Sequence, residues 1–242
     1  MQVSKIKNLI EQNKSGAGEF AVAEGLHAVK HALRFGAKAE YLIARDKNEV
    51  LELSQKLCPD ISDQLEKGVM ELGDDFNKLS DSIIRTGILG IFHKPKEPKL
   101  GIEQGSHVLL DDPRDLDNIG AVIRVCAAAN IQNLIITGNS NAWNSRAIRA
   151  GAGLQFALNI SQNPEILPDL PIISFDERGE ELDNELKQRL PETAIYVFGS
   201  ERDGISDKLK SASTTIVRLP MQEKVSSMNL ATSVAAALYI LK

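Results

Sequence analysis

The stretch TTIVRLPMQEKVSSMNLATSVAAALYILK, residues 214–242, decides how the second half of the chain is interpreted. Its first residues are β-branched and apolar, which predicts a buried parallel strand. From Leu230 onward, apolar side chains recur at helical spacing. Between strand and helix, QEKVSSMN gathers hydrogen-bonding groups, including Ser227 and Asn229, where the helix begins. These groups either cap the helix or hold a ligand.

The composition sets the class of protein before any motif is considered. A chain of 242 residues, 43% hydrophobic and 25% charged, is long enough for one large globular domain or two small ones. It contains no run of about 18 apolar residues, and its N-terminal segment lacks the apolar core of a signal peptide. Cys58 and Cys126 form no motif and the four histidines are scattered. We therefore expect a reduced, cytoplasmic location and no metal site.

A break at HKPKEPKLGIEQGS, residues 93–106, separates two predicted domains, 1–99 and 100–242. In the first, the patterns predict helices over 3–14, 24–35, 48–57 and 75–82, and strands over 20–23, 39–45, 69–72 and 87–93. This is a small α/β domain in which 15 basic residues balance 15 acidic ones. The net charge of −5 therefore comes from the second domain, and it argues weakly against a bulk nucleic-acid binder.

The second domain alternates strands and helices more regularly. Strands are predicted at HVLLDD (107–112), NLIITG (133–138), FALNI (156–160), PIISFD (171–176), AIYVFGS (194–200) and TIVRLP (215–220). Helices are predicted over 118–130, 144–151, 179–190, 205–212 and 227–241. Continuous apolar strands separated by helices predict an α/β fold, a parallel sheet with helices on both faces. Ligands bind beyond the carboxyl ends of the strands in such sheets.

Two further polar loops follow predicted strands at that edge. After the first strand, Asp117 or Asn118 is placed to cap a helix that carries Arg124. After AIYVFGS, two glycines bracket Glu201 in a turn that leads into a helix, whose free N–H groups can hold a ligand. Taken alone, each loop also has an ordinary structural interpretation: a helix cap, an arginine exposed to solvent, or a simple strand-to-helix turn. Their occurrence together, with the loop around Ser227, favours a shared site.

The three loops, in this order, resemble the motifs of the SpoU (TrmH) family of S-adenosylmethionine-dependent RNA ribose 2′-O-methyltransferases, within the SPOUT superfamily. DNIGAVIR resembles the first motif, VFGSERDGIS the second and VRLPMQEKVSSMNLATSVAAALY the third, so the resemblance covers residues 106–242. In the first half, FAVAEGLHAVKHALRFGAKAEYLIAR and LSDSIIRTGILGIFHKP resemble, more loosely, the ribosomal-protein-like substrate domain of the family. That domain is typical of members that act on ribosomal RNA.

The resemblance implies a fold and a cofactor that the patterns themselves do not reveal. Members of the family tie a trefoil knot near the C-terminus, which is a rare topology. The knot loops hold S-adenosylmethionine largely through backbone groups, and the domain forms a homodimer. Carried onto this sequence, the residues that contact the methyl donor are Phe198, Gly199, Gly204, Leu219, Met221 and Met228.

The resemblance also implies roles in catalysis. It places Arg124 at the ribose 2′-hydroxyl, with Asn118 holding the arginine or the ribose. An arginine is essentially always protonated, so we expect Arg124 to orient the hydroxyl and stabilise negative charge rather than act as a base. Glu201, Ser227 and Asn229 are expected to orient Arg124 and the substrate.

Contacts with RNA are expected from basic residues outside the three motifs. The family has an additional arginine between the first two motifs, which corresponds to Arg146 or Arg149; the small residues after Arg149 favour the latter. Arg114 and the linker lysines Lys94, Lys96 and Lys99 would extend this basic path, although the lysines equally fit a solvated tether.

Two other functions fit the sequence less well, and a third fits it equally well. A dinucleotide-dependent oxidoreductase needs G-x-G-x-x-G after its first strand, which DDPRDLDNIG lacks. A non-catalytic RNA-binding member of the same fold would be expected to lack Arg124 or Asn118, and both are present. A methyltransferase that acts on transfer RNA is the open alternative, because no single residue distinguishes it from one that acts on ribosomal RNA.

Overall fold

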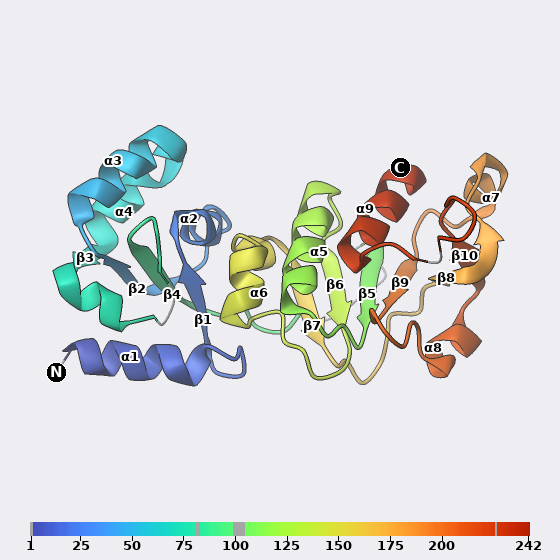
Figure 1. Ribbon diagram of the computed structural model, residues 1–242, viewed down its shortest axis with the longest axis horizontal. Coiled ribbons are helices and arrows are strands. Elements are labelled where there is room, and N and C mark those ends of the chain that lie inside the picture. Colours follow the sequence, from blue (N-terminus) through green and yellow to red (C-terminus); the bar gives the residue numbers. More distant parts are fainter. Residues whose placement is uncertain (1, 81–82, 99–104, 226) are drawn as a thin grey trace. The chain divides into compact units, whose positions relative to one another are not determined.

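The computed structural model describes residues 2–80, 83–98, 105–225 and 227–242, and the chain divides into two compact units (Figure 1). Unit 1 comprises residues 1–96 and 141–157, and unit 2 comprises residues 97–140 and 158–242. The predicted boundary at residues 99–100, like Lys99 itself, lies outside the described residues. Among the helices of the described ranges, none is long and apolar enough to cross a membrane.

Unit 1 is built on a four-stranded sheet in the order β1-β4-β2-β3, in which β4 is antiparallel to both neighbours and β3 is parallel to β2. Its strands are β1 (Phe20–Glu24), β2 (Ala39–Ala44), β3 (Val69–Glu71) and β4 (Ile88–His93). Its helices are α1 (Gln2–Asn13), α2 (Leu26–Arg34), α3 (Lys47–Leu57), α4 (Ser62–Gly68) and α6 (Ser145–Ala150), with 3-10 turns Pro59–Ile61, Gly73–Lys78 and Leu154–Ala157. The predicted strands are confirmed. The predicted helix 75–82 is wrong where the structure describes it, because Gly73–Lys78 form a 3-10 turn, and its last two residues, 81 and 82, lie outside the described residues. Helix α4 was not predicted.

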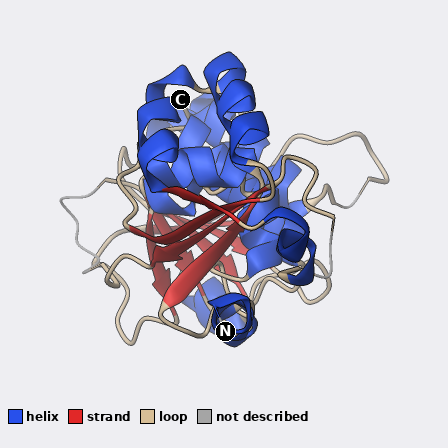
Figure 2. Cartoon of the chain, turned by 90° about the vertical axis from the view of Figure 1, so that its left-hand side faces the viewer, coloured by secondary structure: helices blue, strands red, loops and turns tan. Residues whose placement is uncertain are grey.

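The alternation of side chains along β4 explains how helices cover both faces of this sheet. Ile91 packs with Ile6 and Ile10 of α1 in one hydrophobic cluster. The preceding position, Gly90, faces the other side, where a Cβ atom would lie 2.3 Å from the ring of Phe92 and 3.2 Å from the side chain of Val29 on α2. Glycine at this position therefore leaves room for the Phe92 ring beneath α2. Figure 2 shows α1, at the N-terminus, and the other helices of unit 1 on opposite sides of the strands.

The segment 141–157, which the sequence placed in the second domain, belongs to unit 1. Its helix α6 packs against β1. The carbonyl oxygen of Ala152 lies 2.7 Å from Nδ1 of His31 on α2, and the ring of Phe156 stands edge-on to those of Phe92 and Trp143. These contacts bury apolar area against the first sheet, which local sequence periodicity cannot indicate.

Unit 2 contains a six-stranded sheet in the order β10-β8-β9-β5-β6-β7, with every neighbouring pair parallel. Its strands are β5 (His107–Asp111), β6 (Asn133–Ile136), β7 (Asn159–Gln162), β8 (Ile172–Glu181), β9 (Ile195–Gly199) and β10 (Thr215–Arg218). Its helices are α5 (Leu116–Ala128), α7 (Asn184–Arg189), α8 (Asp207–Ala212) and α9 (Leu230–Leu241). The predicted parallel sheet of six strands is confirmed, but the strand predicted over 156–160 begins only at Asn159, because residues 154–157 form a 3-10 turn.

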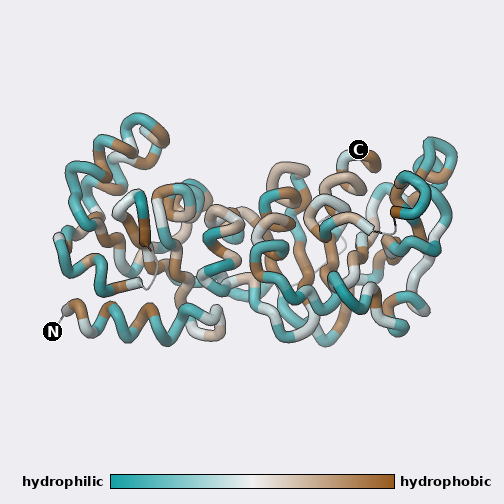
Figure 3. Tube along the Cα trace, viewed as in Figure 1, coloured by the Kyte–Doolittle hydropathy of each residue, from teal (hydrophilic) through white to brown (hydrophobic). Residues whose placement is uncertain are grey.

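Helices cover both faces of this sheet, as predicted. Leu209 of α8 packs with Leu109 of β5 and Val197 of β9 on one face. Helices α5 and α9 pack against each other, and α9 also contacts β9 (Figure 1). Figure 3 shows hydrophobic residues concentrated in the strands and hydrophilic residues in the loops, as a sheet buried on both faces requires.

The predicted helix 179–190 is wrong at its start, because β8 extends to Glu181 and α7 begins only at Asn184. Glu180 and Glu181 pair with Val217 and Arg218 of β10, whereas Ser174 pairs with Ile216. Residues 175–179 therefore lie outside the β8–β10 ladder before the strand resumes. Pairing with a neighbouring strand has overridden the helical tendency of this charged run.

Candidate functional site

A cavity of about 780 Å³ opens at the carboxyl ends of β8, β9 and β10, bounded by the start of α9. Its lining includes all six residues predicted to contact the methyl donor, namely Phe198, Gly199, Gly204, Leu219, Met221 and Met228. Three of the predicted catalytic residues, Glu201, Ser227 and Asn229, also line it. The volume lies within the range of small-molecule sites, and the lining combines apolar side chains with a few polar groups.

The loop after β9 forms one wall and is closed by its own backbone. The N–H of Ser200 donates to the carbonyl of Gly204 at 3.1 Å, and the N–H of Gly204 donates back at 3.2 Å. Gly204 adopts a φ of 67°, a conformation that favours glycine. A Cβ atom on Gly199 would lie 2.1 Å from the backbone carbon of Gly204. Both glycines are therefore required by the turn, which holds its backbone groups at the cavity.

Three polar side chains from separate motifs form a continuous chain of hydrogen bonds at the edge of the cavity. Asn229 Nδ2 donates to Asn118 Oδ1 at 2.8 Å, and Asn118 Nδ2 donates to Glu201 Oε1 at 2.7 Å. Asn118 and Glu201 follow the neighbouring strands β5 and β9, whereas Asn229 follows β10, which lies beyond β8, and is brought to them at the start of α9, which packs against α5 and β9. The expectation that the three loops meet is confirmed for these side chains.

The helix caps differ from the sequence prediction, and the difference matters for the site. Asp115, rather than Asp117 or Asn118, caps α5 by accepting from the N–H of Asp117 at 2.8 Å. Asn229, rather than Ser227, caps α9, accepting from the N–H of Ala231 at 2.9 Å. Asn118 therefore does not cap α5, and its amide connects Asn229 and Glu201.

Glu201 is held as a carboxylate by its hydrogen bonds. Partial burial acts to raise the pKa of Glu201, but the bond from Asn118 and those from nearby backbone N–H groups outweigh it and lower the pKa. One of those groups is the N–H of Arg114, which donates to Glu201 Oε2 at 3.2 Å. An ionised Glu201 accepts hydrogen bonds only, so it orients the Asn118 amide with its oxygen toward Asn229.

Arg124 is exposed on α5 and does not line the cavity. Its guanidinium forms no hydrogen bond or ion pair with any residue in the described ranges. The structure thus joins Asn118, Glu201 and Asn229, places Ser227 at the cavity, and leaves Arg124 apart from these four. The role of Arg124 remains a prediction.

The three arginines predicted to bind RNA lie in different parts of the chain. The guanidinium of Arg114 pairs with Asp203 and lies 3.9 Å from Asp112. Arg146 and Arg149 belong to α6 in unit 1; both are exposed, and Arg149 pairs with Glu24 at 3.4 Å.

Lys94 of the linker has a structural contact. Its ammonium donates to the carbonyl of Gly16 at 2.6 Å, and burial lowers its pKa. This lysine is therefore tied to unit 1 rather than extended as part of a solvated tether.

The sequence analysis missed the contribution of β8 to the cavity. Phe175, Asp176 and Arg178 line it, together with Lys210 of α8. The rings of Phe175 and Phe198 stack with centroids 4.7 Å apart and planes at 4°, forming an apolar wall. The rule that ligands bind beyond strand carboxyl ends applied equally to β8, but DERG matched no motif and was not considered.

A model of the SpoU rRNA methylase family matches residues 105–239, more than half of the sequence. The chain belongs to this family. The 23S rRNA (guanosine(2553)-2′-O)-methyltransferase RlmP of Bacillus subtilis is 23% identical over 228 residues, covering 90% of this chain and 87% of that protein. The 23S rRNA (adenosine(1067)-2′-O)-methyltransferase of Streptomyces azureus is 26% identical over 175 residues, covering 67% of this chain and 65% of that protein.

A solved structure of an rRNA methyltransferase has the same fold. The AdoMet-bound rRNA methyltransferase from Sinorhizobium meliloti superposes with a TM-score of 0.77 at 20% identity, over 99% of this chain and 93% of that one. The likeness extends over both units, so unit 1 also has its counterpart in a protein of this kind.

Proposed function

We propose that this SpoU family member catalyses methylation of a ribose 2′-hydroxyl in ribosomal RNA, with S-adenosylmethionine as the methyl donor. The hydrogen-bonded chain Asn229–Asn118–Glu201, at the edge of a cavity lined by all six donor-contact candidates, carries this proposal. The 2′-O-methyltransferase from Bacillus that matches 90% of the chain supports it.

The residues present fit an adenosyl donor. The stacked Phe175 and Phe198 and the side chains of Leu219 and Met228 suit a planar base, and polar backbone of the loop after β9 lies beside them. When bound, S-adenosylmethionine would supply a methyl group on a positively charged sulfur, and the neutral thioether S-adenosylhomocysteine would be the leaving group. The trefoil knot implied by the resemblance is part of this proposal.

The protein's own groups act by positioning and by electrostatics. A methyl transfer requires the acceptor oxygen to be aligned with the methyl carbon, and holding both in place supplies much of the acceleration. Asn118, fixed from both sides, presents a rigid amide to the ribose. Arg124 stabilises the negative charge that develops on the 2′-oxygen, while the proton leaves to water or a neighbouring phosphate, because a guanidinium cannot accept it.

Unit 1 is proposed to bind the RNA, with unit 2 as the methyltransferase domain, close to the division predicted at residue 99. Arg146 and Arg149, exposed on α6, and Arg114 are the proposed RNA contacts. We further propose a homodimer through unit 2. Tyr239 and Ile240 on α9 are 58% and 37% exposed, an apolar surface that a second copy would cover. The cytoplasm, where ribosomal RNA resides, is the proposed location.

The test is a tritium-transfer assay with labelled S-adenosylmethionine and bulk RNA from cells lacking the gene. We expect label in ribosomal RNA and none with Arg124→Ala. Label in transfer RNA alone would support ribose methylation but show that the substrate is transfer RNA rather than ribosomal RNA. Absence of label in any RNA, despite measurable donor binding, would favour a non-catalytic RNA-binding role. Analytical ultracentrifugation tests the dimer separately.

A further inference from the structure

We infer that Arg178, on the segment of β8 that leaves the sheet, binds the carboxylate of the amino-acid end of the methyl donor. This inference rests on the proposed function. It assigns a donor contact outside the three family motifs, on a segment that the sequence did not mark.

The segment 175–179 is held firmly at the cavity. Lys210 of α8 forms an ion pair with Asp176 Oδ2 at 2.8 Å, and the N–H of Arg178 donates to Asp176 Oδ1 at 3.1 Å. Gly179 is pressed against β10, where a Cβ atom would lie 2.5 Å from the backbone carbon of Val217. The backbone that carries Arg178 is therefore fixed from both sides, and a fixed backbone lowers the entropy lost when the side chain binds a ligand.

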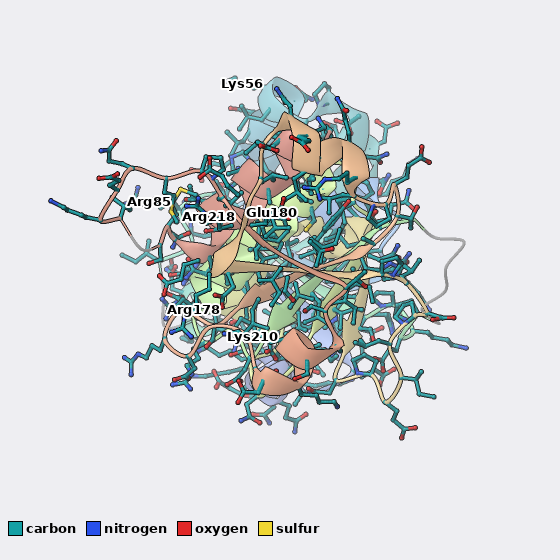
Figure 4. The ribbon with its side chains drawn as sticks, turned by 90° about the vertical axis from the view of Figure 1, so that its right-hand side faces the viewer. Lys56, Arg85, Arg178, Glu180, Lys210 and Arg218 are labelled. Atoms are coloured by element: carbon teal, nitrogen blue, oxygen red, sulfur yellow. The ribbon has the colours of Figure 1, made fainter. Side chains whose placement is uncertain are left out.

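Several charged side chains near this end of unit 2 form ion pairs; Figure 4 labels Glu180, Lys210 and Arg218 among them, together with Arg178. On β8, Asp176 pairs with Lys210, Glu180 with Arg189 of α7, and Glu181 with Arg218 of β10 at 2.7 Å. The guanidinium of Arg178, in contrast, forms no ion pair or hydrogen bond with any residue that the structure describes. It lines the cavity, so its donors are available to a ligand there.

The position of Arg178 along the sheet edge indicates which part of the donor it meets. Asn118 and Glu201 follow β5 and β9, where the proposed reaction occurs, whereas Arg178 belongs to β8, on the far side of β9. The donor has one negatively charged group, its carboxylate, and a guanidinium binds carboxylates through paired N–H groups. Glu177, which also lines the cavity, supplies an opposite charge beside it for the donor's ammonium group.

Arg202, a second arginine that lines the cavity, is the competing candidate, since Lys210 is paired with Asp176. It adjoins Glu201 on the loop after β9, at the end where the ribose hydroxyl is proposed to enter. The donor carboxylate must lie away from the methyl group's acceptor, which favours Arg178. The two arginines therefore give a direct comparison within one cavity.

The test is calorimetric binding of S-adenosylmethionine and of decarboxylated S-adenosylmethionine to the full chain and its variants. We expect Arg178→Gln to weaken binding of S-adenosylmethionine about tenfold, the size of one lost charged hydrogen bond, and to leave binding of the decarboxylated compound unchanged. Arg178→Lys should recover part of the loss. Arg189→Gln, which removes an equal charge on α7 outside the cavity, should bind both compounds as the wild type does.

Several results would overturn this assignment without touching the proposed function. They are equal affinity of Arg178→Gln and wild type for S-adenosylmethionine, equal weakening for both compounds, or the selective loss in Arg202→Gln instead. Loss of RNA binding in Arg178→Gln with donor binding intact would assign the arginine to the substrate. If the wild type bound neither compound, the proposed function itself would fail, and this inference with it.

Discussion

Replacing Gly199 by alanine tests whether the turn after β9 forms the donor site. The added methyl group would lie 2.1 Å from the backbone carbon of Gly204, 2.3 Å from the nitrogen of Ile205 and 2.5 Å from the oxygen of Gly204. Carbon atoms in contact prefer about 3.5–4.0 Å, so the backbone at 204–205 must move by about 1 Å or more. Because these are backbone atoms, no side-chain rotation relieves the clash.

The expected cost of Gly199→Ala is about 1–3 kcal/mol of stability, the usual range for an overpacked site. For a chain of this size that corresponds to a fall of roughly 2–10 °C in the melting temperature. The two hydrogen bonds between Ser200 and Gly204 would also be strained. Since they shape the cavity wall, binding of S-adenosylhomocysteine, measured by calorimetry, should weaken by about tenfold or more.

Gly36→Ala is the matched control for Gly199→Ala. Gly36 has a φ of 74° and nothing within 4 Å of an added Cβ atom, and it lies in unit 1. Its substitution should cost about 1–2 kcal/mol through backbone conformation alone and leave binding of S-adenosylhomocysteine unchanged. Wild-type affinity and melting temperature in Gly199→Ala would refute the proposed role of the close approach between residues 199 and 204.

Three further predictions follow from the site and the core. Arg124→Ala should lower the turnover number about 100-fold or more while S-adenosylhomocysteine affinity stays within twofold, as expected for a group that acts on developing charge; equal loss of both would contradict that role. The lowered pKa of Glu201 means that its carboxylate adds stability that is fully present above pH 4.5 and lost as the pH falls through the lowered value. Denaturant unfolding of Glu201→Gln and wild type should therefore converge on acidification, and a constant difference would be inconsistent with this linkage. Burial raises the pKa of Cys126 to about 12, so iodoacetamide should label it only in denaturant, as mass spectrometry would detect, whereas labelling of the folded protein would disprove its burial.

The sequence predicted the sheet of unit 2 because its strands are short apolar runs between clear breaks. The prediction from sequence was wrong where the secondary structure depends on pairing between strands that are far apart in the sequence. The run DERGEE has the polarity of an exposed helix start, yet β10 pairs with Glu180 and Glu181 and extends the strand. Likewise, residues 144–151 carry a helical pattern that was recognised, but the pattern says nothing about whether α6 packs against β1 or against the second sheet.

The helix caps show a second limit of predicting structure from sequence. Asp115, Asp117 and Asn118 all have side chains suited to an N-cap, and only the backbone conformation selects among them. The selection of Asp115 has a functional consequence, since it leaves the Asn118 amide free for Glu201 and Asn229. The sequence motifs thus proposed the residues of the candidate site, while the hydrogen bonds of Asn118 depend on which of three neighbouring residues caps α5.

The joining of distant motifs follows from strand order. Asn118 and Glu201 are 83 residues apart, but β5 and β9 are neighbours in a parallel sheet, so the loops that leave their carboxyl ends must emerge side by side. The same reasoning adds β8, the other neighbour of β9: its pairing with β9 ends at Phe175, and residues 176–178, which follow and line the cavity, were overlooked because they form no motif. At this edge three acidic residues, Asp176, Glu180 and Glu181, each form an ion pair with a basic residue of another element. The negative charges of these three carboxylates are therefore offset by their partners, while Glu177, which lines the cavity, remains available for the ammonium group of the donor.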